Sequence, residues 1–143
     1  MPDTSNHYIG DDGKYVAVTR DIRVRVSSQY LEGQSEPGAG RYAWAYTIEI
    51  INEGDIPVQL RERKWEITDA NGVVETVQGE GVVGKQPTLN PGDAFEYTSG
   101  CPLSTDSGFM VGQYVMRTDS NEMFEVDIPA FALDLPHQRR TMN

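Results

Sequence analysis

The amino-acid sequence predicts an all-β protein, a sandwich of about seven or more short antiparallel strands. Apolar and polar residues alternate along most of the chain, which is the period of a strand with one buried face. No window of a dozen residues carries apolar side chains at the spacing of an amphipathic helix. The 14 glycines and 8 prolines are spread throughout and would interrupt most candidate helices. Short strands with frequent turns favour a sandwich, and a small barrel is the alternative.

The first strands are predicted at residues 22–26 and 41–52. In residues 22–26 apolar and charged side chains alternate, which indicates a half-buried strand. Residues 33–40, rich in glycine and polar residues, form a loop. The segment 41–52 is the strongest strand, because one face is aromatic and β-branched and small alanines lie on the other. The residues on that first face are Tyr42, Trp44, Tyr46, Ile48 and Ile50. We expect this strand to be central.

The next strand changes phase along its length. Its apolar residues fall on even positions up to Leu60 and on odd positions from Trp65. A side-chain period of two cannot shift without an extra residue, so we predict a bulge or bend between them. Residues 69–72 form a hairpin turn whose Asn-Gly pair supplies two positive φ values, and residues 73–78 return as the partner strand.

The second half of the chain holds one long loop and three further strands. Residues 79–93 combine glycines and prolines and are predicted to be the loop. Alternation predicts strands at residues 94–99, 109–118 and 123–128. Pro129 then breaks strand pairing.

Length and composition fit one domain of 143 residues. We expect a flexible N-terminal tail at 1–14, the sandwich at 15–133 and a flexible C-terminal tail at 134–143. Cys101 is the single cysteine, so no internal disulfide can form and a cytoplasmic location is expected. The polar N-terminus does not resemble a signal peptide, and no apolar run is long enough to span a membrane.

The formal net charge is −10. Such a field repels phosphate backbones, so we expect no general binding to nucleic acid. An acidic surface keeps a domain soluble and also suits a cation or a basic partner.

Gly79, Gly81 and Gly84 match the pattern G-x-G-x-x-G of dinucleotide-binding loops. In those proteins a helix follows and directs its N-terminus at the phosphates. Here Pro87 and Pro91 forbid a regular helix. Two interpretations remain: a glycine-rich connection between strands, or a nest of N–H groups that binds an anion with the help of Lys85.

Arg61, Arg63 and Trp65 would share one face of a regular strand. They could form a partner-binding patch, because arginine and tryptophan are favoured at binding hot spots. They could equally form a cation–π stack that only fixes the indole on the sheet.

The sequence offers no catalytic constellation. His7 and His137 fall in the predicted tails, and Cys101 has no evident base beside it. One cysteine and two distant histidines cannot build a zinc site, and the acidic turns lack the closing carboxylate of a calcium loop. We therefore expect a protein that is not an enzyme and that holds no metal or cofactor.

The chain resembles the ApaG family over roughly residues 16–133. The segments that carry the resemblance are YAWAYTIEI at 42–50, NEG at 52–54, RKWEITD at 63–69, GEGVVG at 79–84, LNPG at 89–92, FEYTSGC at 95–101, GQY at 112–114 and IPAF at 128–131. The resemblance implies a fibronectin type III-like sandwich and no established enzymatic activity. It also implies a link to cobalt resistance and magnesium efflux, and partner binding where the domain occurs inside larger proteins.

These observations predict a binding module for an unidentified protein partner. The alternative is a binder of pyrophosphate or a polyphosphate nucleotide, with or without a divalent metal, through Gly79, Gly81, Gly84 and Lys85.

Overall fold

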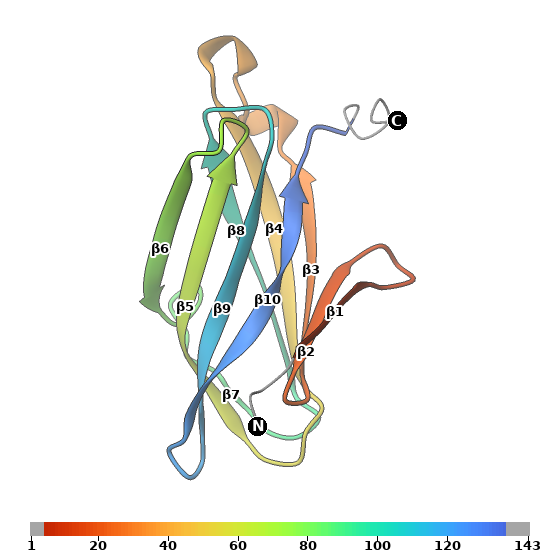
Figure 1. Cartoon of the computed structure of the whole chain (residues 1–143), viewed down its shortest axis with the longest axis vertical. Helices are drawn as coiled ribbons and strands as arrows, with labels where there is room; N and C mark the ends of the chain where they lie inside the picture. The colour runs from red at the N-terminus through yellow and green to blue at the C-terminus, as the bar shows by residue number, and fades with distance from the viewer. Residues whose placement is uncertain (1–4, 137–143) are drawn as a thin grey trace.

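The computed structural model describes residues 5–136, which fold into two antiparallel sheets packed face to face (Figure 1). The strands are β1 (Ser5–Ile9), β2 (Tyr15–Thr19), β3 (Ile22–Tyr30), β4 (Tyr42–Asn52), β5 (Val58–Asp69), β6 (Val74–Glu80), β7 (Thr88–Leu89), β8 (Ala94–Leu103), β9 (Gly108–Thr118) and β10 (Met123–Leu133). The first sheet has the order β1-β2-β3-β4-β8, and the second has the order β10-β9-β5-β6 with β7 also paired to β5. This confirms the predicted β-sandwich.

The core lies between the sheets and is built by the alternation that predicted the strands. In β4 the predicted inner face is correct, since Trp44 is 1% exposed and Ile48 and Ile50 are fully buried. The strand is also central, because it pairs with β3 on one side and β8 on the other. Trp65, Tyr114 and Phe131 contribute buried rings from the opposite sheet.

Two bulges let strands keep their apolar faces inward. The register between β5 and β9 shifts between Leu60 and Glu62, which confirms the irregularity predicted there. A second shift, between Ile128 and Phe131, carries β10 past Pro129. Pairing then resumes, so the strand predicted to end at residue 128 continues to Leu133.

The hairpin turn between β5 and β6 forms where it was predicted but with different backbone geometry. Only Gly72 of the Asn-Gly pair has a positive φ, of +82°. The N–H groups of Asn71 and Val73 both donate to the Asp69 carboxylate, at 2.9 and 3.0 Å. Because this side chain closes the turn, the left-handed conformation predicted for Asn71 is not needed.

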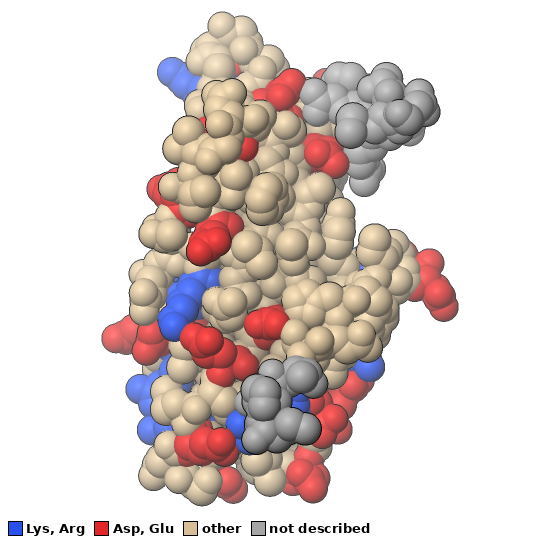
Figure 2. Space-filling model, viewed as in Figure 1, with Lys and Arg blue, Asp and Glu red and all other residues tan. Residues whose placement is uncertain are grey.

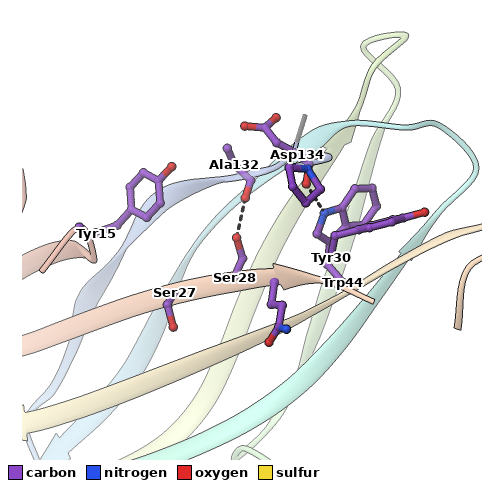
Figure 3. A pocket seen from close by; sticks show the side chains of 10 residues that line it. Tyr15, Ser27, Ser28, Tyr30, Trp44, Ala132 and Asp134 are labelled. Carbon is purple, nitrogen blue, oxygen red and sulfur yellow. Dashed lines mark hydrogen bonds between the residues drawn. The ribbon is translucent and has the colours of Figure 1, made fainter. Parts of the chain in front are cut away.

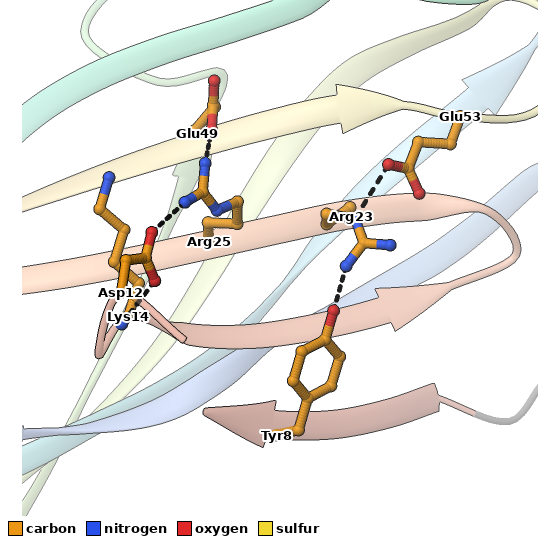
Figure 4. Close-up of polar contacts among 7 residues, drawn as sticks. All are labelled: Tyr8, Asp12, Lys14, Arg23, Arg25, Glu49 and Glu53. Atoms are coloured by element: carbon orange, nitrogen blue, oxygen red, sulfur yellow. Dashed lines mark hydrogen bonds and ion pairs between the residues drawn. The ribbon is translucent and has the colours of Figure 1, made fainter. Parts of the chain in front are cut away.

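The segment predicted as an N-terminal tail is instead a hairpin where the structure describes it. β1 pairs with β2 over its whole length, and residues 10–14 make the turn. The hairpin forms the edge of the first sheet, and polar side chains on the outer face of that sheet link it to β3 and β4 (Figure 4). Arg25 donates to Asp12 and, at 2.7 Å, to Glu49. Residues 5–9 are mostly polar and show no apolar–polar alternation, so the sequence did not indicate a strand there.

Arg23 makes the matching set of contacts further along β3. Its guanidinium donates to the Tyr8 hydroxyl and, over 2.9 Å, to the Glu53 carboxylate (Figure 4). The predicted C-terminal tail begins at residue 134, and Leu135 still packs against the core. The remainder of that prediction, including His137, falls on residues 137–143 and lies outside the described residues.

Acidic side chains are spread along the face seen in Figure 2, as the net charge leads one to expect. No helix within residues 5–136 is long and apolar enough to cross a membrane.

Candidate functional site

The glycine loop follows β6 and is held by Arg63. Gly79 lies opposite Arg63 in the β5–β6 ladder, and a Cβ there would come within 3.0 Å of the Arg63 Nη1 atom. That nitrogen donates to the carbonyls of Glu80 and Gly81, at 3.1 and 2.9 Å. Because Gly79 has no side chain, the Arg63 guanidinium can lie against its backbone. The two hydrogen bonds of Arg63 connect β5 to the loop.

The rest of the loop is a tight turn. Gly81 has a φ of +63°, and a Cβ there would lie 2.3 Å from the Lys85 carbonyl oxygen. Val82 and Lys85 exchange two backbone hydrogen bonds, of 2.8 and 2.9 Å, around Val83 and Gly84. Both central residues have positive φ, of +43° and +78°, as in a type I′ turn.

The three glycines therefore each serve the local fold. The N–H groups of Gly81, Val82 and Lys85 donate to carbonyls of the chain, which leaves the turn tip, Val83 and Gly84, as the part that could meet an anion. The chain then enters the short strand β7, in agreement with the prediction that no helix follows the motif.

The structure does not present Arg61, Arg63 and Trp65 as one surface patch. Trp65 is 4% exposed and packs edge-on against Tyr46 and Phe131, with ring centroids 5.5 and 5.9 Å away. Its indole therefore belongs to the core and is not part of a surface patch. The bulge at Arg61 takes that residue out of the regular alternation, whereas Arg63 and Trp65 lie beyond it and share a face of β5.

Cys101 and the tyrosines near it are buried between the sheets. Burial raises the pKa of the Cys101 thiol to about 11, with a smaller contribution from the Glu75 carboxylate. The hydroxyls of Tyr97 and Tyr114 are 2.5 Å apart, and burial raises the pKa of both. Groups held neutral in this way are poor nucleophiles and bases at neutral pH.

An aromatic groove lies at the end of the sandwich where β3 and β10 finish. It consists of two adjoining hollows of about 280 and 580 Å³, which share Tyr30 and Pro136. We define the aromatic groove by the apolar residues that line it, namely Tyr30, Pro37, Tyr42, Trp44, Leu135 and Pro136. The Tyr30 ring meets Trp44 edge-on at 5.4 Å, and the Tyr42 ring stacks on Trp44 at 6.5 Å.

Side chains of the first sheet bond to the backbone of β10 along the smaller hollow (Figure 3). Ser28 Oγ donates to the Ala132 carbonyl, and Trp44 Nε1 donates to the Asp134 carbonyl, both at 2.9 Å. Because these bonds join the two sheets, the walls of the groove are fixed in position.

The groove is negatively charged. Its lining includes the carboxylates of Glu32, Asp106 and Asp134, and no lysine or arginine from the described part of the chain. Sequence reasoning missed this site. It assigned Tyr42 and Trp44 to the core and did not single out Tyr30, whose position at a strand end beside a Gly-Pro loop was the available signal.

A family model described as the ApaG domain matches residues 32–118. The chain is 62% identical to Protein ApaG of Brucella anthropi over 129 residues, which are 90% of this chain and 99% of that protein. This chain belongs to the ApaG family. The Brucella abortus ApaG protein is 57% identical over the same length. A crystal structure of a Bordetella pertussis protein described as ApaA superposes with a TM-score of 0.79 and 46% identity, covering 81% of this chain and 94% of that one.

The region matched by the ApaG model includes the glycine loop and Arg63 but only part of the aromatic groove. Tyr42, Trp44 and Asp106 fall within residues 32–118, whereas Ser28 and Asp134 lie outside them. The groove is thus assembled from the matched region and its flanks.

One further cluster in this ApaG protein contains the residue types of a hydrolytic triad. Ser5, His7 and Asp127 lie together where β1 crosses β10, but Ser5 and Asp127 both contact the same imidazole nitrogen, Nε2, at 2.9 and 3.1 Å. Ser5 also bonds directly to Asp127. A triad needs the carboxylate and the hydroxyl on different ring nitrogens, so this geometry is a surface contact rather than a proton relay. Within residues 5–136 no group of three or more His, Cys, Asp or Glu side chains is placed to hold a metal ion.

Proposed function

We propose that this ApaG protein is a non-catalytic binding module and that the aromatic groove holds a protein partner. The observation that carries the proposal is the groove itself, in which Tyr30, Tyr42 and Trp44 meet beside a rim of carboxylates. Aromatic side chains supply large contact area at low entropic cost and are enriched at protein interfaces. The bonds from Ser28 and Trp44 to β10 support a preformed surface, which lowers the cost of binding.

A comparative pull-down tests this proposal. The wild-type chain, a Tyr30→Ala/Tyr42→Ala variant and a Phe109→Ala control would be immobilised and exposed to crosslinked lysate of the source cells. Phe109 is 46% exposed on β9 and does not line the groove, so it controls for the loss of a surface ring. We expect a partner that wild type and control retain and the groove variant loses. Equal recovery with all three proteins would contradict the proposal.

A second candidate function, binding of pyrophosphate or a polyphosphate nucleotide, is favoured by one observation. Val83 adopts a φ of +43° and is 53% exposed at the turn tip, beside Gly84 and Lys85. A β-branched residue is unusual in the left-handed region, and such backbone strain is concentrated at functional sites. Of the binding residues proposed from the sequence, Gly81, Gly84 and Lys85 belong to this loop, and Gly79 lies just before it in β6.

Titration with pyrophosphate, with and without Mg²⁺, tests the second candidate. The amide signals of Gly84 and Lys85 should move in wild type and move less in Lys85→Gln. Signals that stay in place at millimolar pyrophosphate exclude the loop as an anion site.

Two expectations accompany the binding role. A cytoplasmic location rests on the single cysteine, and a part in magnesium and cobalt homeostasis rests on what the ApaG resemblance implies. Growth of a deletion strain in elevated Co²⁺, complemented by wild type or by the groove variant, tests the second of these.

A further inference from the structure

One edge of β3 extends beyond its neighbour. β2 pairs with β3 only as far as the contact between Tyr15 and Val26. The chain before Tyr15 turns back at residues 10–14 to form β1, so it does not continue along β3. β3 itself runs on to Tyr30. Among residues 5–136, nothing fills the strand position of the first sheet beside residues 28–30, within the smaller hollow of the aromatic groove.

The hydrogen-bond alternation of an antiparallel ladder points backbone groups into this open position. The Leu31 N–H donates to the Ala43 carbonyl, which makes the odd-numbered residues of this part of β3 the ones bonded to β4. The N–H and C=O groups of Ser28 and Tyr30 therefore point away from β4 and toward the open position. Unpaired strand edges of this kind readily accept another extended segment.

The opposite wall of the opening is the free edge of β10. The carbonyls of Ala132 and Asp134 point toward β3, where the Ser28 hydroxyl and the Trp44 indole bond to them (Figure 3). These two side-chain bonds occupy the carbonyls of Ala132 and Asp134 and hold the sheets together at this end. Of the two edges that face the opening, the edge of β3 is therefore the one that can accept a new strand.

We infer that an extended peptide of a partner protein adds as a strand to β3 at residues 28–30 and places a basic side chain against the carboxylates of Glu32 and Asp134. This inference rests on the proposed binding function and names the partner's chemistry. Backbone pairing would supply affinity, and the pockets beside it would supply specificity. Tyr30 and Tyr42 form the apolar contact surface, while Glu32 and Asp134 select positive charge.

A basic peptide fits this position better than a second copy of the chain. Each copy carries a net charge of −10, and the groove adds acidic side chains at the contact, so two copies repel each other. The opening is also short, since only Ser28 and Tyr30 direct backbone groups into it, which suits a segment of a few residues.

The test begins with selection from a random heptapeptide library displayed on phage, using the full chain as bait. We expect the selected peptides to contain arginine or lysine. The best peptide is then synthesised with an N-methyl group at each position in turn. Strand addition requires alternate N–H groups, so methylation at positions of one parity should weaken binding about tenfold and at the other parity should be tolerated. Equal tolerance at every position would overturn strand addition.

Charge reversal in the groove supplies the matched variants. Asp134→Lys keeps the backbone carbonyl that accepts from Trp44 and should lower affinity for the basic peptide at least tenfold. Asp119→Lys makes the same change in the exposed turn between β9 and β10, away from the groove, and should leave binding within about twofold. Ser28→Pro removes both the N–H that does not bond to β4 and the hydroxyl that bonds to Ala132, and should abolish binding. Ser28→Ala loses the same hydroxyl but keeps the N–H, so it should retain most of the binding.

The outcomes separate the two proposals. Peptide binding that depends on the groove but not on N-methyl parity overturns strand addition and leaves the proposed function standing. Strand addition alone is also overturned if no peptide is enriched while the Tyr30→Ala/Tyr42→Ala variant still loses a partner in the pull-down. Binding unaffected by every groove variant overturns both.

Discussion

At the scale of single residues, several side chains link the core to the aromatic groove. Trp44 is fully enclosed by the core, yet its indole nitrogen bonds to the Asp134 carbonyl at the groove wall. Tyr97 and Tyr114 satisfy each other's hydroxyls across the sandwich, so neither leaves a buried polar group without a partner. Trp65 is different, because its buried Nε1 has no hydrogen-bond partner among the described residues. Its place in the core therefore depends on ring packing alone.

Trp44→Ala should lower the free energy of unfolding by about 3–5 kcal/mol, because it opens a large cavity and frees the Asp134 carbonyl. Urea denaturation followed by circular dichroism measures the change. Trp44→Phe is the control that keeps most of the packing, and it should lose less. A midpoint for Trp44→Ala equal to that of wild type would show that the indole is not part of the core.

The Cys101 thiol should resist modification in the folded protein, since it is 3% exposed and burial raises its pKa to about 11. At pH 8 we expect almost no reaction with a disulfide reagent until denaturant is added, and then one thiol per chain. Rapid labelling of the native protein would indicate an accessible thiolate, and Cys101 could then act as a nucleophile.

At the scale of elements, the sequence predicted the strands that have one buried face but did not predict the exposed strand β1. Alternation identified the inner face of β4 and the bulge in β5, because a buried face leaves a period of two in the sequence. It did not identify β1, whose residues are mostly exposed and are held by contacts with distant charges on β3. Tertiary contacts of that kind leave no local pattern.

Two glycines of the loop should differ in their tolerance of alanine. At Gly81 a Cβ would collide with the Lys85 carbonyl at 2.3 Å, so Gly81→Ala forces the backbone to move. At Gly84 no atom lies within 4 Å, and Gly84→Ala carries only the strain of its positive φ, about 1 kcal/mol. Thermal denaturation should show the larger loss for Gly81→Ala. Equal losses would mean that the close approach to Lys85 is not a constraint.

Docking of the β1–β2 hairpin should weaken in acid. The backbone N–H of Lys14, followed by the charge of Arg25, holds the pKa of the Asp12 carboxyl below its usual 3.8. A lowered pKa in the folded state means that unfolding takes up a proton, so this contribution is present above pH 3.8 and is lost as the pH falls through the folded value.

Hydrogen exchange of the β1 amides in wild type and Asp12→Ala measures this effect. The two proteins should differ at pH 7, and the difference should shrink below pH 3.8 as Asp12 becomes protonated. A difference that is the same at both pH values would show that the carboxylate charge does not hold the hairpin.

At the scale of the whole molecule, the side where β3 and β10 meet is closed at one end and open at the other. Near β1 the hairpin lies at the edge of the first sheet against β10, and the Asp127 N–H of β10 donates to Thr19 Oγ1 of β2 at 3.1 Å. Toward the other end of β3 the hairpin has turned away (Figure 1), and the aromatic groove occupies the space. Strand patterning predicted the two layers. The groove could not be predicted, because it depends on where β2 stops pairing with β3.

An amide chemical-shift map of the full chain with a bound partner peptide tests the central claim most directly. The claim predicts that the largest shifts fall on Ser28, Tyr30, Asp134 and the Trp44 indole N–H, at the open edge of β3. Shifts confined to residues 79–85, or to a face remote from the aromatic groove, would contradict it.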